Sequence, residues 1–391
     1  MMEIRRLAPE ERFDAELIST VAFHFRMEDP EKQKEISRKG TVEDWGAFDT
    51  DGRMMAHIMN HCFESNLDGT RIRNGGIGGV STLPEYRNSG AIRAIFSELL
   101  PSAWRAGEVI STLYPFNHAF YRKFGYETVC PRNVYSFPPS VLREYRFDGP
   151  VRQWKPGDSI APYLHLNHTF AQSWNLSVFR GEERFREAHF EGRYYRDRKF
   201  AYLLGTEEAP CAYVIFQDVR RDPAALLRIE DLAWQGREGF HALLGFLGRF
   251  TADYGTVELP LPRGMELLSL IHSPDAYDIS KQSEQSYMIR VVNVPELLKA
   301  MRKPPRTDFI LRVTDEMIPE NNGSWRVCGE AVTRTELPPD LELNVRALGP
   351  LAAGGISLAE AVYREDVTLL APDRIPEGLF ARRPVFIQER F

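Results

Sequence analysis

The chain has 391 residues, a formal net charge of −6, and 43% hydrophobic and 27% charged residues, a composition typical of a globular protein with two or three domains. Charges of both signs are mixed throughout, so we expect no nucleic-acid partner. No apolar run is long enough for a membrane span or a signal peptide. The four cysteines are far apart and form no C-x-x-C pair. We therefore expect a reduced, cytoplasmic protein without a metal site.

The first segment reads as an α/β domain that ends near the two prolines after Phe137. Its periodicity predicts a helix over Pro9–Phe25, a charged stretch over Glu28–Arg38, and strands over Trp45–Asp49, Met54–Glu64 and Arg71–Leu83. We interpret Gly75–Gly79 as a turn that leads into the last of these strands. His57 and His61 lie on a predicted strand without the Glu spacing of a zinc protease, so we expect them to be structural.

The stretch from Val80 to Ile92 predicts a strand that ends in a glycine-containing loop and runs directly into an amphipathic helix. Such a loop aims several backbone N–H groups at one point, where the helix dipole also favours an anion. Arg87 adds a positive charge, and Gly90 allows a phosphate to approach closely. The spacing fits neither a nucleoside-triphosphate loop nor a dinucleotide loop. Arg87-x-x-Gly90 after a strand resembles the pyrophosphate loop of the GNAT N-acetyltransferases, which bind acetyl-CoA.

A second motif follows a strand that begins at Ser111. The sequence Ala119-Phe-Tyr-Arg-Lys-Phe-Gly-Tyr126 resembles the F-Y-x-x-x-G-[YF] pattern that closes the acyl-CoA site of the same family. The resemblance implies that Tyr121 faces the sulfur of the coenzyme as a general acid. A phenol with a pKa near ~10 can protonate a thiolate with a pKa near ~8.5. The alternative is that Tyr121 only packs among the neighbouring aromatic residues.

The GNAT resemblance also implies which residues bind acetyl-CoA. The backbone of one strand pairs with the pantetheine arm, the loop and helix start wrap the pyrophosphate, and two residues after the next strand contact the arm. The residues concerned are Val80, Ser81, Thr82, Arg87, Asn88, Ser89, Gly90, Ala91, Ile92, Arg93, Phe116 and Asn117. Ile92 departs from the Gly or Ala of most GNAT proteins.

The second segment repeats the strand–helix–strand order of the first. The pattern predicts a hairpin over Phe200–Gln217, a strand over Leu226–Trp234, a helix over Gly239–Phe250 and a strand over Thr256–Pro260. The turn before this helix has the wrong Arg-to-Gly spacing and carries Glu238, which would repel a phosphate. We therefore predict a degenerate copy without coenzyme binding. The mixed charges of Arg184–Arg198 predict a solvated helix face.

The third segment begins near Ser286 and predicts strands over Ser286–Val292 and Asp308–Asp315, a polar turn into Trp325, and a helix over Leu351–Val362. It resembles the sterol-carrier-like domain that ends the Eis-type (enhanced intracellular survival) acetyltransferases. The expected fold class is α/β (α+β), with tandem GNAT folds followed by a sterol-carrier-like α+β domain. The expected domains are residues 1–145 (active GNAT), 146–287 (degenerate GNAT) and 288–391 (sterol-carrier-like).

No Asp or Glu of the first segment stands out as a general base. In the Eis type, the carboxylate at the end of the chain reaches the active site, which implies that Phe391 supplies the base here. The apolar ending Val385–Phe391 is unusual for a free tail. The alternative is a strand end that only covers a sheet. The resemblance also implies a homo-oligomer, a hexamer.

The expected reaction is acetyl transfer to a primary amine by direct attack in a ternary complex. The amine is a small molecule such as an aminoglycoside, or a lysine or peptide amine. The alternative function is a non-catalytic acyl-CoA-binding or lipid-binding protein that uses the sterol-carrier-like domain.

Overall fold

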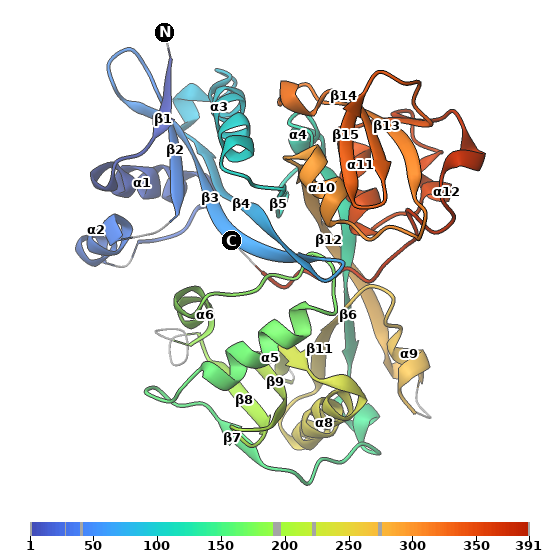
Figure 1. Cartoon of the computed structure of the whole chain (residues 1–391). Helices are drawn as coiled ribbons and strands as arrows, with labels where there is room; N and C mark the ends of the chain where they lie inside the picture. The colour runs from blue at the N-terminus through green and yellow to red at the C-terminus, as the bar shows by residue number, and fades with distance from the viewer. Residues whose placement is uncertain are drawn as a thin grey trace.

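The computed structural model describes residues 2–27, 29–39, 42–190, 197–220, 224–272 and 276–389. Within these residues the strands form one sheet of 12 strands and one of five, which we call the large sheet and the small sheet. The large sheet runs through two lobes, and the small sheet with its helices forms a third (Figure 1). None of the described helices is long and apolar enough to cross a membrane.

The large sheet joins strands from distant parts of the sequence. Its spatial order is β1 (Glu3–Arg6), β2 (Glu43–Phe48), β3 (Met54–Leu67), β4 (Thr70–Thr82), β5 (Ile110–Leu113), β12 (Ser280–Val291), β6 (Glu127–Phe137), β11 (Thr256–Leu261), β10 (Leu226–Trp234), β9 (Pro210–Val219), β8 (Lys199–Gly205) and β7 (Val151–Gln153). The long strand β6 pairs with β12 along much of its length and with β11 at its far end, so it links the first lobe to the second.

Helices cover both faces of the large sheet in the first lobe. These are α1 (Arg12–Phe23), α2 (Pro30–Lys39), α3 (Ala91–Arg105) and α4 (His118–Arg122). In α3, Ile95, Phe96, Leu99 and Leu100 are buried at spacings of three and four residues, as a helix packed on a sheet requires. Helices α1 and α3 lie on either side of β1 and β2 in Figure 1, and they pack into separate apolar clusters.

The second lobe contains the elements that the sequence predicts between Phe200 and Pro260, with α8 (Gly236–Gly248) after β10. Its other helices are α5 (Ala161–Ala171), α6 (Glu182–His189) and α9 (Leu267–Leu270). The strand predicted at Ser286–Val292 exists, but β12 pairs with β5 and β6 of the large sheet and not with the small sheet. It therefore runs across the expected domain boundary at residues 287 and 288, and the limits of the three domains stay predictions.

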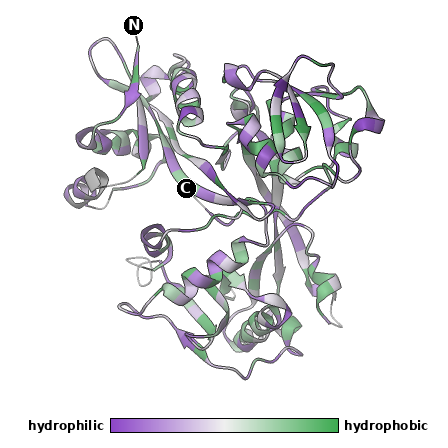
Figure 2. Cartoon of the chain, viewed as in Figure 1, coloured by the Kyte–Doolittle hydropathy of each residue, from purple (hydrophilic) through white to green (hydrophobic). Residues whose placement is uncertain are grey.

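The third lobe is built on the small sheet, in the order β15 (Ala331–Thr335), β14 (Gly323–Cys328), β13 (Asp308–Thr314), β16 (Leu341–Asn344) and β17 (Val367–Leu369). Its helices are α10 (Val294–Ala300), α11 (Val345–Ala353) and α12 (Leu358–Ala361). Figure 2 shows hydrophobic residues gathered on these strands and on α8 of the second lobe.

Two predictions about glycines are wrong. The helix predicted over Leu351–Val362 is broken, because Gly354 adopts φ +82° and ends α11. Gly75–Gly79 is not a turn but part of β4, paired with β3. At Gly75 an added Cβ would lie 2.2 Å from a Glu108 carboxylate oxygen, so this glycine lets a side chain pack directly on the strand.

Candidate functional site

The site begins where β4 and β5 separate. The two strands run parallel from Asn74 opposite Ile110 to Ile77 opposite Leu113. There β5 ends, whereas β4 continues to Thr82. The β5-facing backbone of residues 78–82 therefore has no strand partner within the described chain. An extended ligand with amide groups can pair with such an edge as an added strand. The predicted residues Val80, Ser81 and Thr82 lie on this edge.

The loop predicted to bind an anion lies directly beyond this edge. Asn88 and Gly90 adopt φ values of +64° and +86°, and α3 starts at Ala91, whose N–H donates to the Ser89 hydroxyl at 3.4 Å. Successive backbone N–H groups in such turns form a concavity that suits an anion. The Arg87 and Ser89 side chains are exposed. An added Cβ at Gly90 would meet no atom within 4 Å, so the space beside the loop is open.

Tyr121 lies at the point of strand separation. Its ring is 3% exposed and belongs to the apolar cluster that contains Ile77 and Leu113, the last paired residues of β4 and β5. Two further predicted residues, Val80 and Ile92, pack against the same cluster. The Tyr121 hydroxyl has no hydrogen-bond partner among the described residues. Burial raises the pKa of this phenol well above its usual value.

The other predicted residues take different positions. Phe116 is 65% exposed and contacts the Tyr121 ring edge-on, with ring centroids 5.3 Å apart. The Asn117 side-chain oxygen accepts a hydrogen bond from the Phe120 N–H at 3.0 Å and so caps α4. This oxygen is therefore already engaged within the protein. Arg93 is exposed, and its guanidinium stands 5.7 Å from the centroid of the Phe124 ring.

A cavity of about 930 Å³ lies beside β3, the strand that pairs with β4 on the side away from β5. Its walls come from α1 and β3 of the first lobe and from residues 178–187 of the second. Two of its lining residues on β3, His57 and Met59, stand opposite Ser81 and Gly78 of β4 in the strand pairing. His57 is buried and its Nε2 lies 2.9 Å from the Asp44 carboxylate. Burial lowers the pKa of His61 to about 4, so this lining residue is neutral at pH 7.

The end of the described chain lies inside the molecule. Val385 and Ile387 pack into the cluster shared by the first and third lobes, and Phe386 packs into that of the second. The Gln388 side chain hydrogen-bonds to both backbone groups of Leu232, at 3.2 and 2.9 Å. Phe391 lies outside the described residues, so its predicted role stays a prediction.

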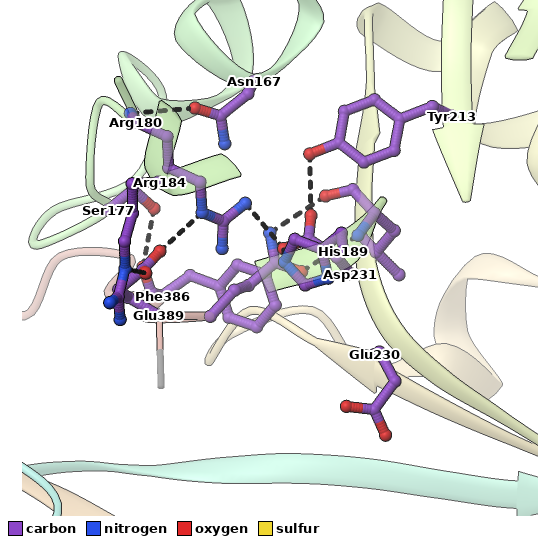
Figure 3. A network of polar contacts seen from close by, with 12 residues as sticks. Asn167, Ser177, Arg180, Arg184, His189, Tyr213, Glu230, Asp231, Phe386 and Glu389 are labelled. Atoms are coloured by element: carbon purple, nitrogen blue, oxygen red, sulfur yellow. Dashed lines mark hydrogen bonds and ion pairs between the residues drawn. The ribbon is translucent and has the colours of Figure 1, made fainter. Parts of the chain in front are cut away.

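Glu389 ends the tail in a buried ionic network (Figure 3). Arg180 donates to its carboxylate at 2.5 Å, and Arg184 at 3.1 Å. Arg180 also forms an ion pair with Asp231 at 2.6 Å. Burial favours the protonated form of Glu389, but the two arginines outweigh it and hold the pKa below its usual value. Arg184 lines the cavity and contacts the tail, so the prediction of a purely solvated face is wrong for this residue.

The tail also reaches the point where β4 and β5 separate. The Tyr287 hydroxyl donates to the backbone carbonyl of Glu389. Its ring contacts Tyr114, the residue directly after β5, with centroids 5.3 Å apart. Sequence reasoning missed Arg180, Asp231 and Tyr287, because they lie on separate segments that only the fold brings together.

The corresponding turn of the second lobe is filled by protein. Gln235 donates its N–H to the Cys211 carbonyl at 2.8 Å, just before α8 begins. At Gly239, in the first turn of α8, an added Cβ would lie 2.3 Å from the same carbonyl oxygen. The start of α8 therefore packs directly on β9.

Comparisons with known proteins find an acetyltransferase domain near the start of the chain and a sterol carrier protein domain near its end. Residues 3–129 match the acetyltransferase (GNAT) domain and residues 294–387 the sterol carrier protein domain. An uncharacterized N-acetyltransferase of Streptomyces avermitilis is 32% identical over 104 residues, and one of Streptomyces coelicolor is 34% identical over 82 residues. The matched part covers 26% of this chain and 25% of the first relative, and 20% of this chain and of the second.

Solved structures match over the whole chain. A GCN5-related N-acetyltransferase from Anabaena variabilis has a TM-score of 0.87 at 20% identity, and Eis1 from Mycobacterium abscessus has 0.83 at 20% identity. Each comparison covers 100% of both chains and shows a shared fold. The predicted fold class is thus confirmed, and the chain carries an N-terminal GNAT acetyltransferase domain and a C-terminal sterol carrier protein domain.

Proposed function

We propose that this protein is an Eis-type N-acetyltransferase that transfers the acetyl group of acetyl-CoA to a primary amine. The observation that carries the proposal is the edge of β4 without a described strand partner, which lies between the loop from Arg87 to Gly90 and the buried ring of Tyr121. A thioester coenzyme needs these three features at once: a strand for its amide-containing arm, a loop for its phosphates, and an acid near its sulfur.

In this proposal the pantetheine arm pairs with Val80–Thr82 and the pyrophosphate lies at the start of α3. Backbone N–H groups supply most of the phosphate contacts, because the loop side chains point into solvent. A backbone N–H of the β4 edge polarises the thioester carbonyl. The filled turn before α8 supports a second domain without coenzyme, so one acetyl-CoA binds per chain.

The chemical step forms a C–N bond and breaks the C–S bond. The amine nitrogen attacks the thioester carbon, the Tyr121 phenol gives its proton to the departing thiolate, and a base takes the proton that the amine releases. Burial raises the pKa of Tyr121. The same dry surroundings raise the pKa of the thiolate, so the proton transfer stays matched.

The base in this proposal is the terminal carboxylate of Phe391. The described tail supports it, because the Glu389 carbonyl accepts from Tyr287, whose ring contacts Tyr114 directly after β5. The two residues that follow Glu389 can place the terminal carboxylate at most about 7 Å beyond it.

The amine enters through the cavity between the first and second lobes. Its volume of about 930 Å³ suits a small molecule or a lysine side chain. Its lining carries both signs of charge: Glu183 and Glu187, four residues apart on α6, offer carboxylates to a cationic acceptor, and four arginines line the same cavity. Glu389 is paired with two arginines and is not available to an amine. Small-molecule amines and peptide amines are both possible acceptors in this proposal. The proposal also includes assembly into a homohexamer.

A thiol-release assay tests the function. The purified protein is mixed with acetyl-CoA and a panel of amines that includes aminoglycosides and lysine peptides, and free coenzyme A is titrated with a thiol reagent. Amine-dependent release is expected, together with an acetylated product by mass spectrometry. Tight acetyl-CoA binding without release for any amine would favour the alternative of a non-catalytic acyl-CoA-binding or lipid-binding protein.

The base has its own test. One added C-terminal residue moves the carboxylate roughly 3.5 Å along the chain, and a displacement of this size is enough to cost about 100-fold in rate. Acetyl-CoA affinity should stay unchanged, and an N-terminal extension of the same length is the control. Full activity in the C-terminally extended protein would move the search for the base to His57, whose ring is already oriented by Asp44.

A further inference from the structure

We propose that Arg180 is a positioning residue, which fixes the end of the chain through Glu389 and thereby orients the terminal carboxylate in the active site. The inference rests on the proposed function for its catalytic consequence. The anchoring of the tail rests on contacts of the described residues alone.

The network holds Glu389 by charge and geometry together. The Arg180 side chain is 3% exposed and lies between two carboxylates, those of Glu389 and Asp231. Asp231 is fully buried, and Tyr213 donates its hydroxyl to it at 2.7 Å (Figure 3). Burial opposes the ionised form of Asp231, yet Arg180 outweighs it and keeps the pKa at about 2. Both carboxylates are therefore ionised at pH 7, and each needs Arg180.

The position of Arg180 is fixed from the second lobe. Its backbone N–H donates to the Asn167 side chain at 3.3 Å, and its carbonyl contacts His168 Nε2 at 2.9 Å, both on α5. The guanidinium stands 5.1 Å from the centroid of the Phe185 ring on α6. An arginine held by two helices is a rigid anchor, so the residues that follow Glu389 start from one defined point.

The same segment also forms a wall of the cavity. Arg180 and Arg184 line it, so the tail anchor and the proposed acceptor site share residues. A base that must meet the amine within hydrogen-bond distance gains from this arrangement, because one element orients both reactants.

The test measures the tail directly and the reaction separately. Carboxypeptidase A is added to the intact protein, and release of the C-terminal phenylalanine is followed for the wild type, Glu389→Gln and Arg184→Met. Each variant weakens a charge-assisted hydrogen bond, so release should be about 10-fold faster or more. Arg228→Met is the matched control, because Arg228 pairs with Glu258 in the same lobe and should leave release unchanged.

The kinetic readout separates positioning from loss of fold. In Glu389→Gln, kcat should fall by about 10- to 100-fold while the KM for acetyl-CoA stays constant, and added imidazole or formate should restore part of the rate. Arg180→Met is tested in the same way if it folds. In the Glu389→Gln background it should not lower kcat further, although it destabilises the fold by leaving Asp231 without its cation.

Unchanged phenylalanine release in Glu389→Gln would overturn the anchor. Faster release with unchanged kcat would overturn positioning if a C-terminal extension still lowers kcat. If the extension also has no effect, the base assignment itself fails, and with it the catalytic part of this inference.

Discussion

Replacing Tyr121 with phenylalanine tests the general acid with two independent readouts. The Tyr121 ring is buried, whereas its hydroxyl has no described partner and its oxygen is not fully buried. The ring itself packs against Phe116, Phe120 and Tyr126, contacts that phenylalanine keeps. Tyr121→Phe should therefore be about as stable as the wild type.

Turnover, by contrast, should fall. Loss of a general acid lowers kcat by about 100- to 10,000-fold, while acetyl-CoA affinity should change little because only one oxygen is removed. The assays are thiol release under saturating acetyl-CoA, calorimetric titration with acetyl-CoA, and unfolding in denaturant.

Tyr126→Phe is the matched control, because it is the same substitution in the same cluster. The Tyr126 hydroxyl shares a hydrogen bond of 2.7 Å with Ser111, so its loss should destabilise the fold by about 1 kcal/mol or more and leave kcat nearly unchanged. A Tyr121→Phe protein that is destabilised like Tyr126→Phe and keeps full turnover would refute the reasoning and assign Tyr121 a packing role alone.

Further predictions concern coenzyme binding, pH and assembly. Gly90→Glu should abolish acetyl-CoA binding by repulsion of the phosphates, and calorimetry of the wild type should find one site per chain; two equivalent sites would contradict the degenerate second domain. Burial lowers the pKa of His61 from 6.5 to about 4, so protonation of His61 reduces the free energy of unfolding as the pH falls from 6.5 to 4. Burial raises the pKa of Glu108 from 4.5 to about 7, so ionisation of Glu108 reduces the free energy of unfolding as the pH rises from 4.5 to 7. Each effect amounts to up to about 3 kcal/mol. Relative to the wild type, His61→Gln should thus gain stability as the pH falls from 7 to 4.5, and Glu108→Gln as the pH rises from 4.5 to 7; profiles of both variants that run parallel to that of the wild type would contradict these shifts. Light scattering should find a large homo-oligomer, and a monomer at micromolar concentration would count against the Eis-type proposal.

Sequence reasoning located the features that depend on neighbouring residues. The loop from Arg87 to Gly90 is readable because its strand, turn and helix follow one another along the chain, and positive φ values at Asn88 and Gly90 are typical of these residue types. The aromatic motif around Tyr121 is readable for the same reason. Local propensity also placed most strands of the first two lobes.

The features it missed depend on distant segments. Nothing in the residues of β12 indicates that it inserts between β5 and β6, since strand pairing across the sequence leaves no local pattern. Arg180, Asp231 and Glu389 come from three separate segments, and each alone reads as an ordinary surface charge. Gly354 could have been recognised, because a glycine pair after an apolar helix is a common stop signal.

The insertion of β12 explains how one active site can depend on all three lobes. This strand closes the large sheet between β5 and β6, and its buried Arg290 forms an ion pair of 2.7 Å with Asp315 of the third lobe. Tyr287 of the same strand holds the carbonyl of Glu389, whose side chain is anchored in the second lobe. A shift of any lobe therefore moves the tail relative to the β4 edge. In the proposed function, the second lobe is therefore necessary even if it binds no coenzyme, because Arg180 supplies the fixed point from which the base is positioned.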